Sequence, residues 1–110
     1  MVEYAYSLDT IFGALANPTR RDILQRLSRS ELMVTEVAEP YSISFAAVSK
    51  HLKVLENAKL VIKRKRGTQN IVQLTPEAFA DAKAYIDYYQ NFWESRLDAL
   101  ENYMLNKENK

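Results

Sequence analysis

Four consecutive cations, Lys63 to Arg66, are the side chains of this sequence best suited to bind another molecule. They precede Gly67, one of only two glycines, in a chain of 110 residues with a formal net charge of +1. Residues 44–70 hold seven lysines and arginines against a single acid, Glu56. A local basic surface on a nearly neutral protein attracts a polyanion to that surface. We therefore expect a nucleic-acid interface here, with a solvated run of charges as the alternative.

The composition argues against several other kinds of chemistry. The chain has no cysteine, which removes disulfides, thiolate metal ligands and cysteine nucleophiles. Its single histidine, His51, lies about 60° around a predicted helix from the apolar stripe Val48, Leu52 and Leu55. This position favours a half-packed ring bonded to backbone or to a phosphate over a catalytic or metal-binding role. No glycine-rich phosphate loop is present. We therefore expect no enzymatic activity and no cofactor.

Helical spacing of apolar residues predicts four helices before the basic run. Asparagine or serine followed by an apolar-periodic segment is typical of a capped helix start, and proline is favoured at the first helical position. The predicted helices are residues 8–15, residues 18–28 with Asn17 as cap, residues 36–41 with Thr35 as cap, and residues 44–58 with Ser44 as cap.

The fourth helix has one apolar and one polar face. Val48, Leu52 and Leu55 fall at i, i+4 and i+7 and predict a buried stripe. A rotation of about 100° per residue then places a different set of residues on the exposed side. These exposed residues are Ala46, Lys50, Lys53 and Asn57, with Ser49 on the flank.

The basic run itself reads as part of a hairpin. Residues 61–66 and 70–74 are strand-like, and Gly67 in the intervening "GTQ" can supply the unusual backbone dihedrals of a turn. Side chains alternate along a strand, so Lys63 and Lys65 share one face while Arg64 and Arg66 share the other. We expect a two-stranded ribbon in which only the cations nearest the turn grip a phosphate row.

Thr75 and Pro76 begin a last helix, whose apolar residues recur every three or four positions for about 45 Å. A helix longer than its domain requires, with an apolar stripe to its end, predicts a homodimer. The alternative is a break near Gln90 and a helix that folds back. Its aromatic residues favour helix packing over a small-molecule pocket. The expected dimer contacts are Leu8, Ile11, Phe12, Tyr89, Trp93, Leu97, Leu100 and Met104.

The order of these elements is that of a winged helix-turn-helix, and the residues carry a family resemblance. The segments "LDTIFGALANPTRRDILQRLS", "ELMVTEVAEPYSISFAAVSKHLKVLENAKLV" and "FWESRLDALENY", with the hairpin between the last two, resemble the ArsR family of bacterial repressors. The resemblance implies one mainly helical domain over residues 1–110. Its parts would be an N-terminal helix (1–16), a helix-turn-helix (35–58), a wing (61–74) and a C-terminal dimerisation helix (76–106).

The resemblance also implies a homodimeric, sequence-specific repressor that binds a palindromic double-stranded operator. The N-terminal residues of the second helix of such a pair reach base edges in the major groove. The expected DNA contacts are Ser44, Phe45, Ala46, Ser49, Lys50, His51, Lys53, Arg64, Lys65, Arg66, Thr68 and Gln69. Phe45 replaces a polar residue expected at that place, and sideways packing is favoured over an apolar base contact. Arg20 and Arg21 could steady phosphates or form ion pairs, for instance with Asp22.

Metal sensing is a common property of this family, and the ligands it needs are missing from the sequence. Met33 and Thr35 stand in the region where metal-sensing members carry paired cysteines, and residues 77–110 contain no histidine. Glu94, Asp98 and Glu101 form an acidic stripe that could hold a hard cation, although a solvated flank or a partner for a neighbouring subunit's cation is favoured. We therefore expect no bound metal.

Three further expectations follow from the sequence. With no apolar run of 18 residues and no secretory signal, the chain is expected in the cytoplasm and away from membranes. The sequence leaves open whether a small molecule or another protein acts as an effector. A winged helix that serves only as a protein-interaction module is the alternative to a DNA-binding repressor, since a fold alone does not dictate function.

Overall fold

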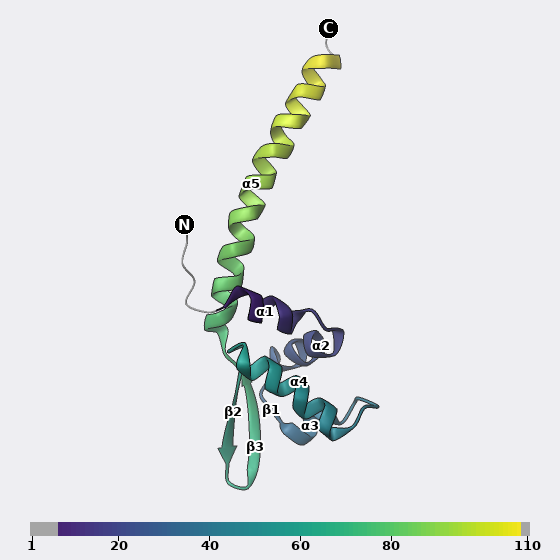
Figure 1. Cartoon of the computed structure of the whole chain (residues 1–110), viewed down its shortest axis with the longest axis vertical. Helices are drawn as coiled ribbons and strands as arrows, with labels where there is room; N and C mark the ends of the chain where they lie inside the picture. Colours follow the sequence, from purple (N-terminus) through teal and green to yellow (C-terminus); the bar gives the residue numbers. More distant parts are fainter. Residues whose placement is uncertain (1–6, 109–110) are drawn as a thin grey trace.

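Five helices and three short strands follow one another through residues 7–108, which the computed structural model describes (Figure 1). Expectations that fall on residues 1–6, including the start of the predicted N-terminal helix, lie outside the described residues. The elements are α1 (Leu8–Leu15), α2 (Pro18–Leu27), β1 (Leu32–Met33), α3 (Val34–Ala38), α4 (Phe45–Asn57), β2 (Val61–Arg66), β3 (Gln69–Leu74) and α5 (Pro76–Glu108).

The helix starts follow their capping residues. Asn17 Oδ1 accepts a hydrogen bond from the Arg20 amide (3.0 Å), and Ser44 Oγ accepts one from the Ala47 amide (3.1 Å), so both predicted caps are confirmed. The prediction for the third helix is wrong at its start. There the Glu36 carboxylate accepts from the Met33 amide (2.8 Å), and α3 begins at Val34.

The core lies where α1, α2, α3 and α4 meet the sheet, and the predicted stripe of α4 points into it. Val48, Leu52 and Leu55 are all buried. Ile11 is also fully buried in its own protomer, packed with these side chains. The expectation that Ile11 contacts a second subunit is therefore wrong, because no part of its side chain reaches the surface.

The sheet has three antiparallel strands in the order β1-β3-β2, and not the two that the sequence predicts. In β1 only Leu32 and Met33 pair with β3, opposite Val72 and Ile71. Arg66 pairs with Gln69, so the turn of the hairpin is two residues long and Gln69 belongs to a strand. Gly67 has φ 66°, which confirms its predicted role in the turn.

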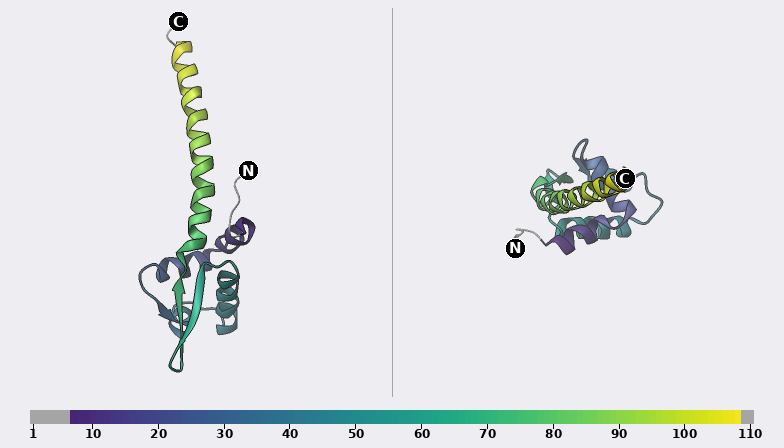
Figure 2. Two further views of the ribbon diagram at one scale, coloured as in Figure 1. Left: turned by 90° about the vertical axis from the view of Figure 1, so that its left-hand side faces the viewer. Right: turned by 90° about the horizontal axis from the view of Figure 1, so that it is seen from above.

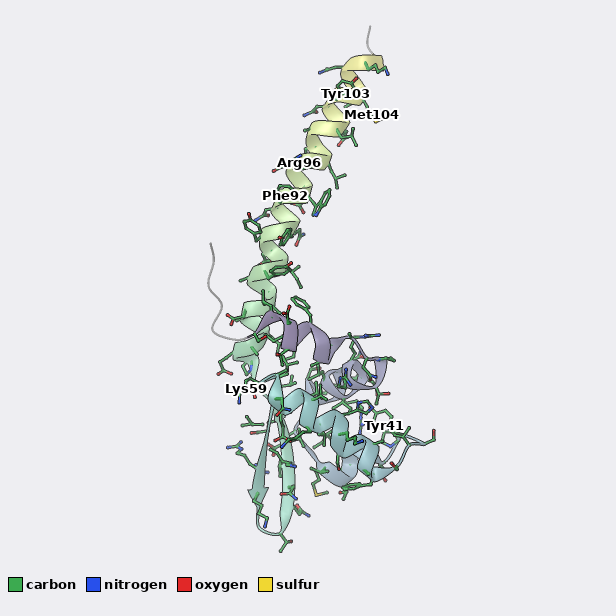
Figure 3. The ribbon with its side chains drawn as sticks, in the orientation of Figure 1. Tyr41, Lys59, Phe92, Arg96, Tyr103 and Met104 are labelled. Atoms are coloured by element: carbon green, nitrogen blue, oxygen red, sulfur yellow. The ribbon has the colours of Figure 1, made fainter. Side chains whose placement is uncertain are left out.

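Helix α4 ends with a left-handed residue that is not glycine. Lys59, labelled in Figure 3, takes a left-handed conformation (φ 61°), which usually favours glycine. Its amide donates to the Glu56 carbonyl (3.0 Å), and the Leu60 amide donates to the Leu55 carbonyl (3.0 Å). These two bonds form a Schellman motif that satisfies the last carbonyls of α4 and turns the chain into β2.

The last helix is continuous over 33 residues, so the alternative of a break near Gln90 is wrong. Ala78 and Ala82, in its first two turns, are buried against the domain. Beyond them α5 leaves the domain on the side opposite the hairpin turn, which gives extents of 73 × 32 × 21 Å (Figures 1 and 2). No helix within residues 7–108 is both long and apolar enough to cross a membrane.

Candidate nucleic-acid interface

The polar face of α4 is open to solvent and cationic. Of the predicted contact residues on this helix, Ala46, Ser49, Lys50 and Lys53 are exposed, and Ser44 before it is exposed as well. Neither lysine forms an ion pair within the described residues. The face thus offers two free positive charges and small side chains that let a helix approach a groove closely.

The hairpin carries its cations on two faces, as the alternation predicts. Lys63 lies on the face shared with the buried Val61 and comes within 3.8 Å of the Glu56 carboxylate at the end of α4. Lys65, on that same face and closer to the turn, forms no ion pair in the described part of the chain. Thr68 lies in the turn, and both it and Gln69 are exposed.

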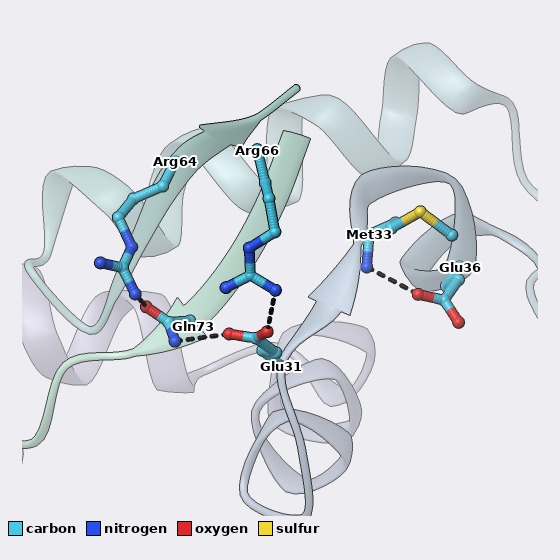
Figure 4. A network of polar contacts seen from close by, with 6 residues as sticks. All are labelled: Glu31, Met33, Glu36, Arg64, Arg66 and Gln73. Atoms are coloured by element: carbon cyan, nitrogen blue, oxygen red, sulfur yellow. Dashed lines mark hydrogen bonds and ion pairs between the residues drawn. The ribbon is translucent and has the colours of Figure 1, made fainter. Parts of the chain in front are cut away.

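The two arginines of the hairpin are joined in one polar network on the other face of the sheet (Figure 4). Arg66 Nη1 donates to Glu31 Oε1 (2.6 Å), and Gln73 Nε2 donates to Glu31 Oε2 (2.6 Å). Arg64 in turn donates to the amide oxygen of Gln73. The hydrogen bond from Arg66 is the main reason that the pKa of Glu31 lies below its ordinary value of 4.5.

Glu31 is a residue that sequence reasoning missed. It is 35 positions from Arg66, and it lies just before a strand of two residues, too short to show a period. The network holds Arg64 and Arg66 against the sheet, so their charges are partly compensated, whereas Lys65 remains free to meet a phosphate.

Arg20 links the first helix to α4. Its Nε donates to the Ala14 carbonyl (2.7 Å) and its Nη2 to the Gly13 carbonyl (3.1 Å), both in the last turn of α1. Its Nη1 lies 3.2 Å from Nδ1 of His51. Because a guanidinium can only donate, Nδ1 accepts and the neutral ring carries its proton on Nε2.

The half-buried His51 is therefore held within the protein, with its neutral form favoured. Burial first, and the Arg20 cation second, lower the pKa of His51 below its ordinary value of 6.5. The expectation that this ring is half-packed is confirmed, but its Nδ1 bonds to a side chain, and not to backbone or phosphate. His51 thus fixes α4 against α1 and α2.

The ion pairs considered for Arg20 and Arg21 from the sequence do not form among the described residues. Arg21 Nη1 donates to the Leu15 carbonyl (2.8 Å), so it caps the end of α1 just as Arg20 does. No ion pair with Asp22 forms within residues 7–108. The carboxylate of Asp22 accepts a hydrogen bond from the Tyr41 hydroxyl (2.5 Å) instead.

Tyr41, labelled in Figure 3, anchors the turn that precedes α4. Besides donating to Asp22, its hydroxyl accepts from Arg26 Nη1 (3.3 Å), whose guanidinium also lies over the Tyr41 ring (5.5 Å). Burial, followed by the bond to Asp22, raises the pKa of Tyr41 above its ordinary value of 10.0. Arg26 also donates to the carbonyls of Val37 and Glu36 (2.9 and 2.8 Å), which joins α2 to α3.

Phe45 does not pack sideways into the fold, so the expectation for it is wrong. It is the first residue of α4, one turn before the buried Val48, and it is 55% exposed. It therefore lies outside the core. It lines a groove of about 350 Å³ between the start of α4 and the hairpin turn. The other lining residues are Met33, Val34, Thr35, Thr68, Gln69 and Asn70.

The apolar residues predicted for a dimer interface on α5 are exposed. Trp93, Leu97, Leu100 and Met104 are each more than half exposed, and Tyr89 slightly less. On α1, Leu8 and Phe12 are half-buried. The ring of Phe12 lies 5.6 Å from that of Tyr85 and ties α1 to the base of α5, and Arg96 lies 4.8 Å from the Phe92 ring (Figure 3).

The acidic stripe Glu94, Asp98 and Glu101 lies on the exposed part of α5. Across residues 7–108, no three histidine, cysteine, aspartate or glutamate side chains are grouped so that they could hold a metal ion.

Two helices joined by a short turn, with the second exposed and cationic beside a hairpin, define a winged helix-turn-helix domain. Residues 15–64 match a family described as a helix-turn-helix domain. The HTH-type transcriptional regulator Rv2034 of Mycobacterium tuberculosis is 42% identical over 91 residues, which are 83% of this chain and 82% of that protein. The transcriptional repressor SdpR of Bacillus subtilis is 28% identical over 85 residues, 77% and 91% of the two chains.

A solved structure is similar over nearly the same length. The crystal structure of the ArsR family transcriptional regulator RHA00566 has a TM-score of 0.79 and 36% sequence identity, and the similarity covers 86% of this chain and 98% of that one. The chain belongs to the ArsR family of transcriptional regulators.

Proposed function

We propose that this protein is a dimeric, sequence-specific DNA-binding repressor that acts in the cytoplasm. The observation that carries the proposal is the exposed face of α4, on which Lys50 and Lys53 have no ion-pair partner within the described residues. A helix of this kind fits the major groove, and its N-terminal residues reach the base edges.

The proposed contacts divide between base reading and backbone binding. Lys50 and Ser49 carry the groups that can pair with base edges, and Ser44 both caps α4 and contacts phosphate. Lys65 near the hairpin turn has a free charge for the phosphate backbone or the adjacent minor groove. The remaining proposed contact residues are Phe45, Ala46, His51, Lys53, Arg64, Arg66, Thr68 and Gln69.

A dimer is proposed from the surface of α5. Its outer turns expose Trp93, Leu97, Leu100 and Met104, a contiguous apolar stripe that a single protomer leaves in water. A second copy covers this stripe in a two-fold arrangement, because helices of two identical chains present the same face to each other. The operator is then palindromic, with half-sites about 34–36 Å apart.

Sensing through thiolates is excluded from the proposal, because the chain has no cysteine. The effector that controls repression is therefore of another chemical kind, such as a small molecule or a second protein. Without an effector, the abundance of the repressor alone controls repression.

Selection from a pool of random double-stranded DNA tests the proposal. We expect a palindromic consensus to be recovered, and affinity for it to fall steeply as salt rises, because lysine contacts with phosphates release counterions. Recovery of no consensus, with weak binding that does not depend on salt, would instead support a protein-interaction module.

A further inference from the structure

Phe45 is an unusual residue to find at the tip of the helix that faces DNA. It is the first residue of α4, and the Ser44 side chain fixes the helix start by accepting from the Ala47 amide (3.1 Å). Its ring is 55% exposed, although burial of an aromatic ring is favourable. The core ends at Val48, one turn further along α4, so the described protomer leaves more than half of Phe45 in water.

The surroundings of Phe45 indicate what covers it. The ring lines the groove of about 350 Å³, which the hairpin lines with Thr68 of its turn and with Gln69 and Asn70 at the start of β3. Two exposed cations belong to the same two elements: Lys65 on β2 pairs with Asn70 of the groove lining, and Lys50 lies further along α4. Neither has an ion-pair partner among residues 7–108. An apolar ring on a surface that also carries free cations complements DNA, which combines bases with charged phosphates.

Within the major groove only one base carries an apolar group. Thymine presents its C5-methyl there, whereas the other bases present donors and acceptors that lose water when an aromatic ring covers them. The first residues of a recognition helix are those that reach base edges. A phenylalanine at this position therefore discriminates in favour of thymine and against cytosine, adenine and guanine.

We propose that Phe45 determines specificity by contacting the C5-methyl of a thymine at one position in each operator half-site. This inference rests on the proposed function, since it names what one residue of that interface reads. Lys50 and Ser49 supply the polar part of the readout, and Phe45 supplies an apolar part that no hydrogen bond can replace.

Replacement of thymine by deoxyuridine tests the inference directly, because it removes the methyl group and leaves every hydrogen-bonding group in place. The operator recovered by selection is synthesised with one thymine per half-site replaced in turn, and dissociation constants are measured. We expect the wild-type protein to lose affinity at one position per half-site by about fourfold for each methyl that is no longer buried. Phe45→Ala should bind with equal affinity to the operators that carry thymine and deoxyuridine at that position.

Ile43→Ala is the matched control, because Ile43 is also an exposed apolar side chain (41%), two residues before Phe45 and outside the groove lining. The ratio of its dissociation constants for the deoxyuridine and thymine operators should equal that of the wild-type protein. Phe45→Leu, which retains an apolar side chain, should keep part of that ratio. Truncation of an exposed ring leaves the core intact, so all variants should unfold at nearly the same temperature.

The outcomes separate this inference from the function on which it rests. If the wild-type protein binds its operator specifically but no thymine position is sensitive to deoxyuridine, Phe45 does not read a methyl and the proposed function stands. If Phe45→Ala retains the full ratio, another residue such as Ala46 makes the contact, and the inference is wrong. Absence of any specific, salt-dependent DNA binding overturns both.

Discussion

The Glu31 carboxylate lies 2.6 Å from the guanidinium of Arg66, and the two residues are 35 positions apart in the sequence. This ion pair joins the segment before β1 to the cationic strand of the hairpin, so the free protein already holds part of its basic run in place. To make the phosphate contact proposed for it, Arg66 must give up or share this partner. The pair therefore bears directly on DNA affinity.

Glu31→Gln should strengthen binding to random DNA by a few-fold and make it depend more steeply on salt. The substitution removes the carboxylate that compensates Arg66, and the change is small because an exposed ion pair contributes little. Dissociation constants measured at several salt concentrations check both effects. Glu56→Gln is the control, because it removes one negative charge near Lys63 but leaves Arg66 paired. Identical changes in the two variants would show that overall charge, and not release of Arg66, is responsible.

His51 gives the folding stability a dependence on pH. Its pKa in the folded protein lies below 6.5 because of burial and the Arg20 cation. As the pH falls below about 6.5, the unfolded chain takes up a proton before the folded one does, so the free energy of unfolding decreases until the pH passes the folded pKa. Urea unfolding between pH 8 and pH 5 measures this decrease.

His51→Asn is the control for that titration. Asparagine places a carbonyl oxygen near the position of Nδ1, so it can still accept from Arg20, but it does not titrate. The difference in stability between wild type and this variant should therefore change with pH only in the range where His51 titrates. A difference that is constant from pH 8 to pH 5 would contradict the assignment of a titrating His51.

Local signals in the sequence were sufficient for most of the fold. Asn17, Pro18 and Ser44 each mark a helix start through interactions within one turn, and the spacing of Val48, Leu52 and Leu55 identifies the buried face of α4. These features depend on near neighbours along the chain, which is why residue type and spacing predict them.

The features that were missed depend on distant residues. Strand β1 has only two residues and exists because β3 offers it a pairing edge, so it has no period of its own. Arg20 bonds to α1 and to His51, 31 positions away, an arrangement that only the packed helices create. Sideways packing was expected for Phe45, but the core ends at Val48, one turn further along α4, and Phe45 stays 55% exposed.

Lys50 and Lys65 should have different roles in DNA binding. Lys50→Ala should reduce the preference for operator over random DNA by about 1–3 kcal/mol, because Lys50 lies on the exposed face of α4, the helix proposed to read bases. Lys65→Ala should weaken binding to both DNAs by similar factors, since a phosphate contact carries no sequence information. Competition assays give, for each variant, the ratio of its affinities for operator and random DNA. The same ratio in both variants would contradict this division of roles.

Lys59→Gly should stabilise the fold by about 1 kcal/mol. Lys59 has φ 61°, a conformation that costs a residue with a Cβ about 1–2 kcal/mol and costs glycine little. Thermal or urea unfolding measures the gain. Lys53→Gly is the matched control, since the same exchange in the exposed interior of α4 should destabilise by about 1 kcal/mol. If Lys59→Gly and Lys53→Gly both destabilised the protein, the backbone at Lys59 would not be strained.

The exposed stripe of α5 should determine the oligomeric state. Trp93→Glu combined with Leu97→Glu places carboxylates on both copies of a two-fold interface, so the protein should become monomeric and lose operator affinity, as should a chain truncated after Gln90. Sedimentation equilibrium measures the mass in each case. Ser95→Glu adds a single carboxylate on the opposite side of α5 and should remain dimeric. A double variant that is still a dimer would show that the subunits associate elsewhere, for instance through Leu8 and Phe12 of α1.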